Sequence, residues 1–170
     1  MKWSADGYRL PTEAEWEKAA RGGLSGQRFP WGNMISWSQA NYCAYPLAYP
    51  FGVPYGYAYD LSPAVGVDPT FNDGVDPLTS PVGYFGPNGY GLYDMAGNVW
   101  QTCWDWYGSY SNGAQRDPRG PASGSYRMLR GGSWPESPNY CRAGDRNGRI
   151  WPSRKGYDMG FRAVLPPTQP

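Results

Sequence analysis

The chain contains no histidine, and this absence removes several kinds of chemistry. It excludes Ser-His-Asp and Cys-His activation of a nucleophile, histidine general bases and histidine-ligated zinc or iron. Cysteine is also scarce, because only Cys43, Cys103 and Cys141 are present, too few for a closed four-cysteine metal site. The odd number leaves at least one thiol unpaired within a monomer. Two alternatives stay open for Cys103 and Cys141, namely a disulfide or buried free thiols.

Charge and long apolar runs are scarce as well. Charged residues make up 17% of the 170 residues, and the net charge is +1. This balance gives no electrostatic reason to expect nucleic acid or an anionic membrane as a partner. No run approaches the length of a membrane-spanning helix, so we expect no membrane insertion. Residues 1–20 carry charges throughout and lack the apolar stretch of a signal peptide, and the cellular location stays open.

Glycine, proline and aromatic residues are abundant instead. Glycine (24) and proline (18) together make up about a quarter of the chain, a share that can indicate disorder. Aromatic residues make up 17%, however, and disordered segments are poor in aromatics. The composition therefore predicts one folded domain that is rich in loops and has an aromatic core.

Local patterns predict one clear helix and a few short strands. Thr12 and Glu15 have the spacing of a capping box, and a Gly-Gly pair ends the apolar periodicity, so we expect a helix over 12–21. We expect strands over 99–106, 126–129 and 160–165, and a long irregular region over 29–87. In the first strand the three tryptophans Trp100, Trp104 and Trp106 share one face by period two, which predicts that this face is buried.

Six segments carry motifs in an order that resembles one protein family: YRLPTEAEWEKAARGG at 8–23, FPWGN at 29–33, TSPVGYFGPNGYGLYDMAGNVWQTCWDW at 79–106, RMLRGGSW at 127–134, CRAGDR at 141–146 and GFRAVL at 160–165. By these motifs nearly the whole chain resembles the formylglycine-generating-enzyme (sulfatase-modifying factor) domain family. The resemblance implies an α+β, loop-rich C-type lectin fold with a small twisted antiparallel sheet and one or two helices. It implies a single domain over 1–165 with a flexible tail over 166–170. The family's front strand and first helix are expected to be missing or to lie outside this sequence.

The resemblance also bears on catalysis. Formylglycine-generating enzymes use two cysteines five residues apart, which bind copper. Cys141 falls at the position that resembles the second cysteine, and Glu136 stands in place of the first. A carboxylate is a hard ligand and does not suit Cu(I). Related sulfoxide synthases need histidine ligands for iron. We therefore expect neither copper nor iron and predict that the chain is not an enzyme. The alternative is a formylglycine-generating oxidase that acts on a sulfatase cysteine.

Members of the family bind structural calcium in two loop sites, and oxygen-bearing residues match both here. Calcium takes carboxylate, amide and backbone carbonyl oxygens. The first match offers side-chain oxygens from Asp94 and Gln101 and carbonyls from Gly97 and Val99; the second offers Asn41 and Asp73 side chains with carbonyls from Tyr42 and Val75. The alternative for Asp94 is that its carboxylate only accepts hydrogen bonds from turn amides.

The segment 134–158 has the composition of a binding surface. Rigid aromatics alternate with small polar and basic residues, as in antibody paratopes. Variable proteins of diversity-generating retroelements resemble this arrangement, since their C-type lectin fold carries a diversified region that ends near a Gly-Phe-Arg strand. The sequence thus favours a non-catalytic display domain with a protein or other ligand on its C-terminal face; the alternative is an ordinary surface loop. The expected contact residues are Glu136, Asn139, Tyr140, Asp145, Asn147, Arg149, Trp151, Arg154, Tyr157 and Asp158. Arg130, Arg146 and Arg162 are expected to point inward.

Overall fold

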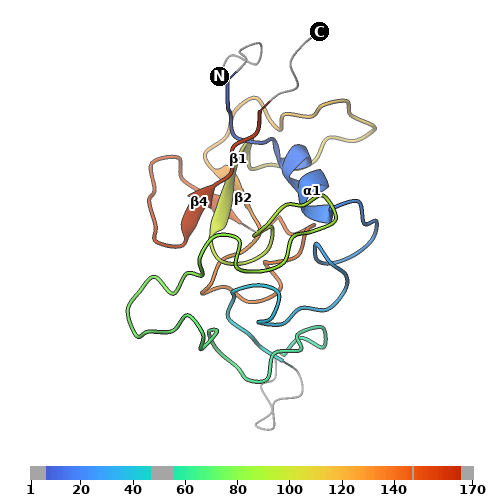
Figure 1. Cartoon of the computed structure of the whole chain (residues 1–170). Coiled ribbons are helices and arrows are strands. Elements are labelled where there is room, and N and C mark those ends of the chain that lie inside the picture. The colour runs from blue at the N-terminus through green and yellow to red at the C-terminus, as the bar shows by residue number, and fades with distance from the viewer. Residues whose placement is uncertain (1–6, 47–55, 147, 166–170) are drawn as a thin grey trace.

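The computed structural model describes residues 7–46, 56–146 and 148–165, and these residues contain one helix and four strands. The helix is α1 (Glu13–Arg21), and the strands are β1 (Trp100–Trp106), β2 (Arg127–Arg130), β3 (Arg149–Ile150) and β4 (Met159–Phe161). Figure 1 shows α1 and the sheet in one half of the molecule and irregular loops in the other. The predicted tail over 166–170 and the contact residue Asn147 lie outside the described residues.

Helix α1 forms as its capping residues predict. The Glu15 amide donates to the Thr12 hydroxyl at 3.2 Å, and the Thr12 amide donates to the Glu15 carboxylate at 2.8 Å. Gly22 ends the helix in the left-handed region with a φ of 54°, where a side chain would be strained. The helix buries Trp16 and Ala20 against the sheet. The predicted helix is therefore confirmed at both ends.

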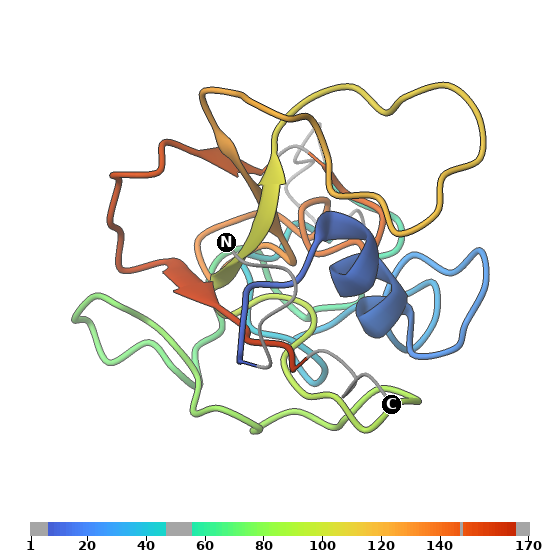
Figure 2. The same cartoon turned by 90° about the horizontal axis from the view of Figure 1, so that it is seen from above.

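The four strands form one small sheet in the order β3-β2-β1-β4. Strand β1 pairs antiparallel with β2 and parallel with β4, and β2 pairs antiparallel with β3. The sheet is curled and mixed, not purely antiparallel as expected, because the chain returns to β1 through a crossover before β4 (Figure 2). The last strand is shorter than predicted; beyond it Val164 makes only an isolated bridge to Arg9.

The prediction that the tryptophan face of β1 is buried is wrong for two of its three tryptophans. The side of β1 that packs against α1 carries Cys103, which joins Trp16 in one core cluster. On the opposite face only Trp100 is fully buried, whereas Trp104 and Trp106 are half-buried. The Arg127 guanidinium covers their rings at 4.8 and 3.6 Å from the centroids. Trp100 packs with Leu129 and Ile150 in a buried cluster of its own, and the pairing of β1 with β2 is irregular between Thr102 and Trp106. Period-two alternation reveals neither the partners of Trp100 nor this irregularity.

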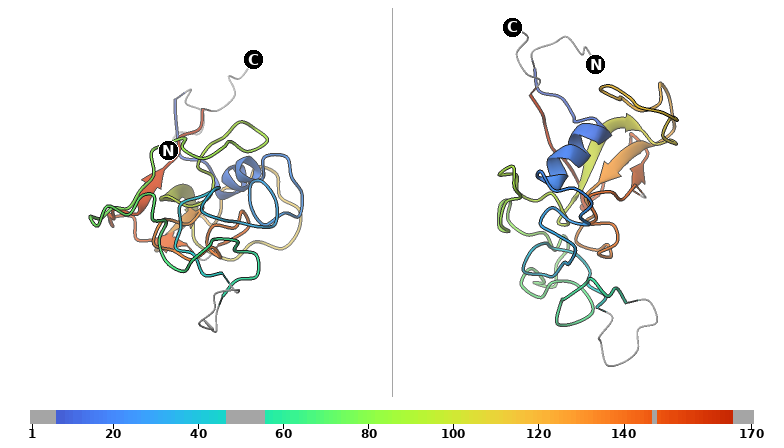
Figure 3. Two further views of the ribbon diagram at one scale, coloured as in Figure 1. Left: turned by 60° about the horizontal axis from the view of Figure 1, so that its bottom comes forward. Right: turned by 90° about the vertical axis from the view of Figure 1, so that its right-hand side faces the viewer.

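A second core cluster holds the irregular region together. Phe29, Ile35, Tyr42 and Ala96 pack in it with Cys141, and loops from distant parts of the chain meet there. The right-hand view in Figure 3 shows the lower half of the molecule, which the irregular loops form, without helix or strand. All three cysteines are free, so the disulfide alternative for Cys103 is wrong; the two buried thiols belong to different clusters. Within the described part of the chain, no helix has the length and apolarity needed to span a membrane.

Candidate functional site

The predicted contact residues fall into three groups by exposure. Arg149, Trp151, Arg154 and Tyr157 are exposed, and Glu136, Asn139, Tyr140 and Asp158 are half-buried. Asp145 is buried, so its predicted place on the surface is wrong. Its carboxylate accepts a hydrogen bond from Arg142 at 3.4 Å, and its carbonyl accepts one from the fully buried Arg130. Asp145 is therefore part of the interior that holds the arginines.

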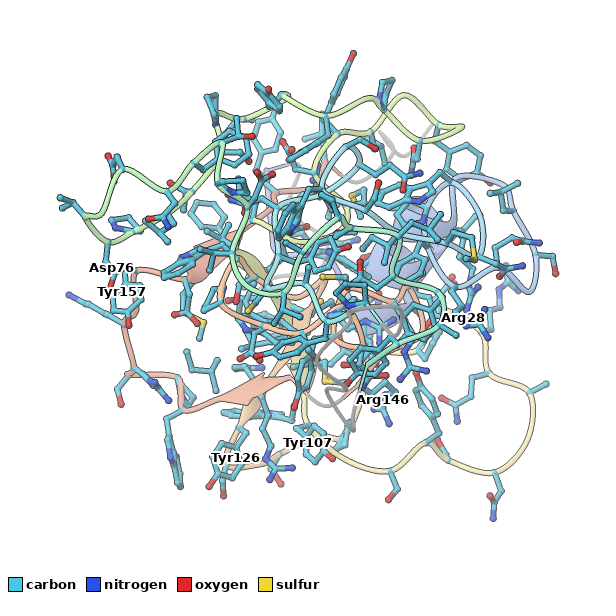
Figure 4. The ribbon with its side chains drawn as sticks, turned by 90° about the horizontal axis from the view of Figure 1, so that it is seen from below. Arg28, Asp76, Tyr107, Tyr126, Arg146 and Tyr157 are labelled. Atoms are coloured by element: carbon cyan, nitrogen blue, oxygen red, sulfur yellow. The ribbon has the colours of Figure 1, made fainter. Side chains whose placement is uncertain are left out.

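The exposed members do not form one continuous patch. The Trp151 ring lies 4.2 Å from that of Tyr126, and the Arg149 guanidinium lies over Tyr107 and Tyr126 at 5.1 and 5.8 Å. We call these four residues the β3 face. Figure 4 shows Tyr107 and Tyr126 next to each other and Tyr157 well apart from them. Sequence reasoning missed both tyrosines because they follow β1 and precede β2, outside 134–158.

The three arginines of the family motifs point inward, as predicted. Arg130 has no exposed surface and donates to Glu17 at 2.6 Å and to the Ala143 carbonyl at 2.7 Å. Arg146 donates to both carboxylate oxygens of Glu13, at 2.6 and 3.0 Å. Arg162 donates to Gln101 at 3.0 Å, and burial lowers its pKa. These side chains hold the loops to α1 and β1 and are scaffold.

The residues at the family's cysteine positions do not offer a two-thiolate metal site. Cys141 is completely buried, and this burial raises the pKa of its thiol. A Cβ on Gly132 would lie 2.9 Å from the Cys141 sulfur, so only glycine fits against it. Glu136 is half-buried; burial raises its pKa, while a hydrogen bond from Trp100 acts in the opposite direction. One buried thiol and a carboxylate do not fit a copper ion held by two thiolates.

The first predicted calcium site has one available carboxylate oxygen. Asp94 accepts the Gly83 amide at 2.7 Å through Oδ2, while its buried Oδ1 has no hydrogen-bond partner among the described residues. The Gln101 side-chain oxygen already accepts from Trp16 at 2.8 Å and from Arg162 at 3.0 Å. Its amide group donates to the Asp94 backbone carbonyl at 2.6 Å. The side chain of Gln101 is therefore already occupied by hydrogen bonds to Trp16, Arg162 and Asp94. Calcium binding at Asp94 stays a prediction.

The second predicted calcium site is more dispersed. Asn41 is buried and donates to the Leu78 carbonyl at 2.8 Å, and the Tyr42 carbonyl accepts the Trp37 indole at 3.1 Å. Asp73 and Val75 are exposed, and the Asp73 carboxylate accepts the Val75 amide at 3.0 Å in a local turn. A Cβ on Gly97, a residue of the first site, would collide with the Asn41 carbonyl, so the two predicted sites adjoin. The described ranges contain no group of three or more histidine, cysteine or acidic side chains placed to hold a metal ion.

The helix, the curled sheet and the loop architecture define a C-type lectin-like domain of the formylglycine-generating type, and the comparisons agree. A family model described as "Sulfatase-modifying factor enzyme 1-like domain" matches residues 1–166, and the chain belongs to this family. A formylglycine-generating enzyme from Thermomonospora curvata is 39% identical over 95% of the chain and 50% of its own length. The solved structure of Treponema denticola variable protein 1 has a TM-score of 0.69 and 35% identity, over 98% of the chain and 50% of that protein.

The prediction that the chain is not an enzyme is contradicted by these relatives. Four of them, from Thermomonospora curvata, Streptomyces coelicolor, Mus musculus and Bos taurus, are 37–39% identical over most of the chain and are named formylglycine-generating enzyme. Another relative from Bos taurus, 36% identical over 93% of the chain and 44% of its own length, is named "Inactive C-alpha-formylglycine-generating enzyme 2". The chain spans about half the length of the curated enzymes from Thermomonospora curvata and Streptomyces coelicolor.

Proposed function

We propose that this domain of the formylglycine-generating type binds a polypeptide through its β3 face. The observation that carries the proposal is the composition and exposure of this face. Trp151 is 52% exposed although it rests on Tyr126, and Arg149 is exposed over two tyrosine rings. Tryptophan, tyrosine and arginine are the residues that carry most of the binding energy in protein interfaces. The similarity to a variable protein structure supports a surface that presents side chains on a fixed scaffold.

The positive charge near the β3 face indicates which kind of polypeptide would bind there. Arg149 is exposed and forms no ion pair with any described carboxylate. A ligand with an acidic residue next to an apolar or aromatic anchor complements this cation and the Trp151 ring. The proposed ligand is therefore an acidic segment with at least one large apolar side chain.

A displayed library of random peptides, selected on the purified chain, tests this function. Enriched peptides should be acidic and should contain an aromatic or large aliphatic residue. Their binding should fall on Trp151→Ser and on Arg149→Ser, whereas Tyr84→Ser should leave it unchanged. Tyr84 is a matched control because it is 57% exposed and packs against Phe71 and Phe85, away from the β3 face. Enriched peptides that bind all three variants equally would remove the β3 face from the proposal.

The second candidate function is conversion of a peptide cysteine to formylglycine, which the names of four relatives favour. A cysteine peptide incubated with the chain, copper and oxygen, and then analysed by mass spectrometry, tests it directly. Aldehyde that forms with the native chain and not with Cys141→Ser would establish the activity. Unchanged peptide under the same conditions, with a formylglycine-generating enzyme as positive control, would count against it.

A further inference from the structure

A cavity of about 580 Å³ lies between the first turn of α1 and the loop 108–121 that follows β1. Figure 2 shows this loop beyond the end of β1, next to α1. The cavity has the size of small-molecule sites, which are mostly 300–1,000 Å³ in volume. None of the predicted contact or metal residues lines it, so it is separate from the sites described above. Its wall includes Glu13, Ala14, Asp105, Tyr110, Pro118 and Arg146.

Glu13 and Arg146, which both line this wall, form an ion pair with each other. Glu13 is only 4% exposed, and its carboxylate accepts two hydrogen bonds from Arg146 and one from the Tyr110 hydroxyl at 3.2 Å. The Arg146 guanidinium also donates to the Gly108 carbonyl and stacks on the Tyr110 ring at 3.7 Å. The Glu13 carboxylate also lies 3.4 Å from the Arg130 guanidinium, which pairs with Glu17 as well, so the charge of Glu13 is compensated by two arginines.

Asp105 differs from Glu13 and Arg146, the other charged residues that border the cavity, because it forms no ion pair among the described residues. The charge of Arg127, which does not border the cavity, acts on it from outside the wall. Asp105 is 4% exposed, and its Oδ2 accepts the Glu13 amide at 2.8 Å. Its Oδ1 lies towards Gly120, where a Cβ would come within 2.9 Å of it, so the glycine leaves this oxygen room. Burial raises the pKa of Asp105, and the nearby Glu13 and Glu15 raise it further. A cation in the cavity would stabilise the ionised carboxylate.

The rest of the wall combines aliphatic surface with three neutral polar side chains, those of Ser109, Ser111 and Gln115. It contains no further charge, and this composition indicates which kind of cation would fit. Ala14, Pro118 and Pro121 contribute aliphatic surface, and Gly108 and Gly113 contribute backbone without side chains. An ammonium group with a hydrocarbon stem fits such a site, because the stem packs on the prolines while the charge pairs with the carboxylate. We propose that this cavity binds a primary aliphatic amine, either free or as the side chain of a lysine, with its ammonium group against Asp105.

Titration of the ¹⁵N-labelled chain with n-butylamine, followed by NMR, tests the proposal. We expect saturable shifts confined to the amides of Gly108, Gly113, Gly120 and their neighbours. n-Butanol, which has the same stem without the charge, should bind at least about ten-fold more weakly. Shifts that map outside the loop 108–121 and the start of α1, or equal binding of the alcohol, would overturn the proposal without any variant.

Two variants then isolate the carboxylate. Asp105→Asn keeps an oxygen for the Glu13 amide and removes the charge, so it should weaken butylamine binding about ten-fold. Asp117→Asn is the matched control, because its side chain is 88% exposed in the same loop and does not border the cavity. Unchanged binding by a folded Asp105→Asn would overturn the proposal. Nα-acetyl-lysine methylamide separates the two sources, since tighter binding than butylamine indicates a peptide lysine and equal binding indicates a free amine.

Discussion

Replacement of Trp100 by alanine should destabilise the domain far more than the same replacement at Trp104. Period-two alternation assigns both tryptophans to the same face of β1, four residues apart, so the sequence alone treats them alike. The pairing of β1 with β2 is irregular between Thr102 and Trp106. In the structure, Trp100 is 4% exposed and packs with Leu129 and Ile150, whereas Trp104 is half-buried. The pair therefore tests the tertiary placement of the sheet.

The magnitudes follow from the buried area. An aromatic side chain buries roughly 150–250 Å², which at about 25 cal/mol per Å² is worth about 4–6 kcal/mol when complete. Because alanine retains a fraction of this area, we expect Trp100→Ala to lower the free energy of unfolding by about 3–5 kcal/mol. Trp104→Ala should cost about 1–2 kcal/mol, since the ring is half-buried and the stacked Arg127 adds only a cation–π contact.

Chemical denaturation followed by circular dichroism measures both values. The slope of the unfolding free energy against denaturant concentration is fitted as one shared value for all variants. Domains are typically stable by about 5–15 kcal/mol, so a loss of this size can unfold the Trp100→Ala variant. Trp100→Phe then serves in its place, with an expected cost of about 1–3 kcal/mol. Equal costs at Trp100 and Trp104, or a larger cost at Trp104, would refute the burial of Trp100 against Leu129 and Ile150.

Three further predictions concern carboxylates. Asp145→Ala should lower the free energy of unfolding by about 1–3 kcal/mol, measured by chemical denaturation, because it removes a buried hydrogen-bond partner of Arg142. Asp158→Ala should change it by no more than about 0.5 kcal/mol. A larger loss at Asp158 than at Asp145 would contradict the burial of Asp145. Since burial raises the pKa of Glu136, the folded state binds its proton more tightly than the unfolded state, and stability should fall as pH rises from the unfolded pKa through the folded pKa. Glu136→Gln should remove this fall, and unchanged pH dependence would contradict the burial effect. If calcium binds at Asp94, the melting temperature should rise with the concentration of free calcium, and Asp94→Asn should abolish this rise. A melting temperature that changes with neither calcium nor chelator would mean that the Asp94 carboxylate only accepts hydrogen bonds from turn amides.

The sequence alone was sufficient where the determining interactions are local. The capping box of Thr12 and Glu15 and the glycine after Arg21 involve residues within a few positions of one another, and α1 begins and ends as they predict. The family motifs likewise predicted the loop-rich α+β fold and the inward direction of Arg130, Arg146 and Arg162.

Tertiary structure decided what depends on partners distant in the chain. The packing of α1 buried the Cys103 side of β1, and Leu129 and Ile150 buried Trp100 on the other side, whereas Trp104 stayed half-buried. Alternation along β1 distinguishes the two faces and does not show which positions on them find partners. Asp145 became interior because Arg130, which lies on β2, reaches its carbonyl. The β3 face joins Trp151 to tyrosines that follow β1 and precede β2. The cavity beside Asp105 is formed by α1 and the loop after β1. In each case the partners are far apart in sequence, so only the folded chain brings their side chains into contact.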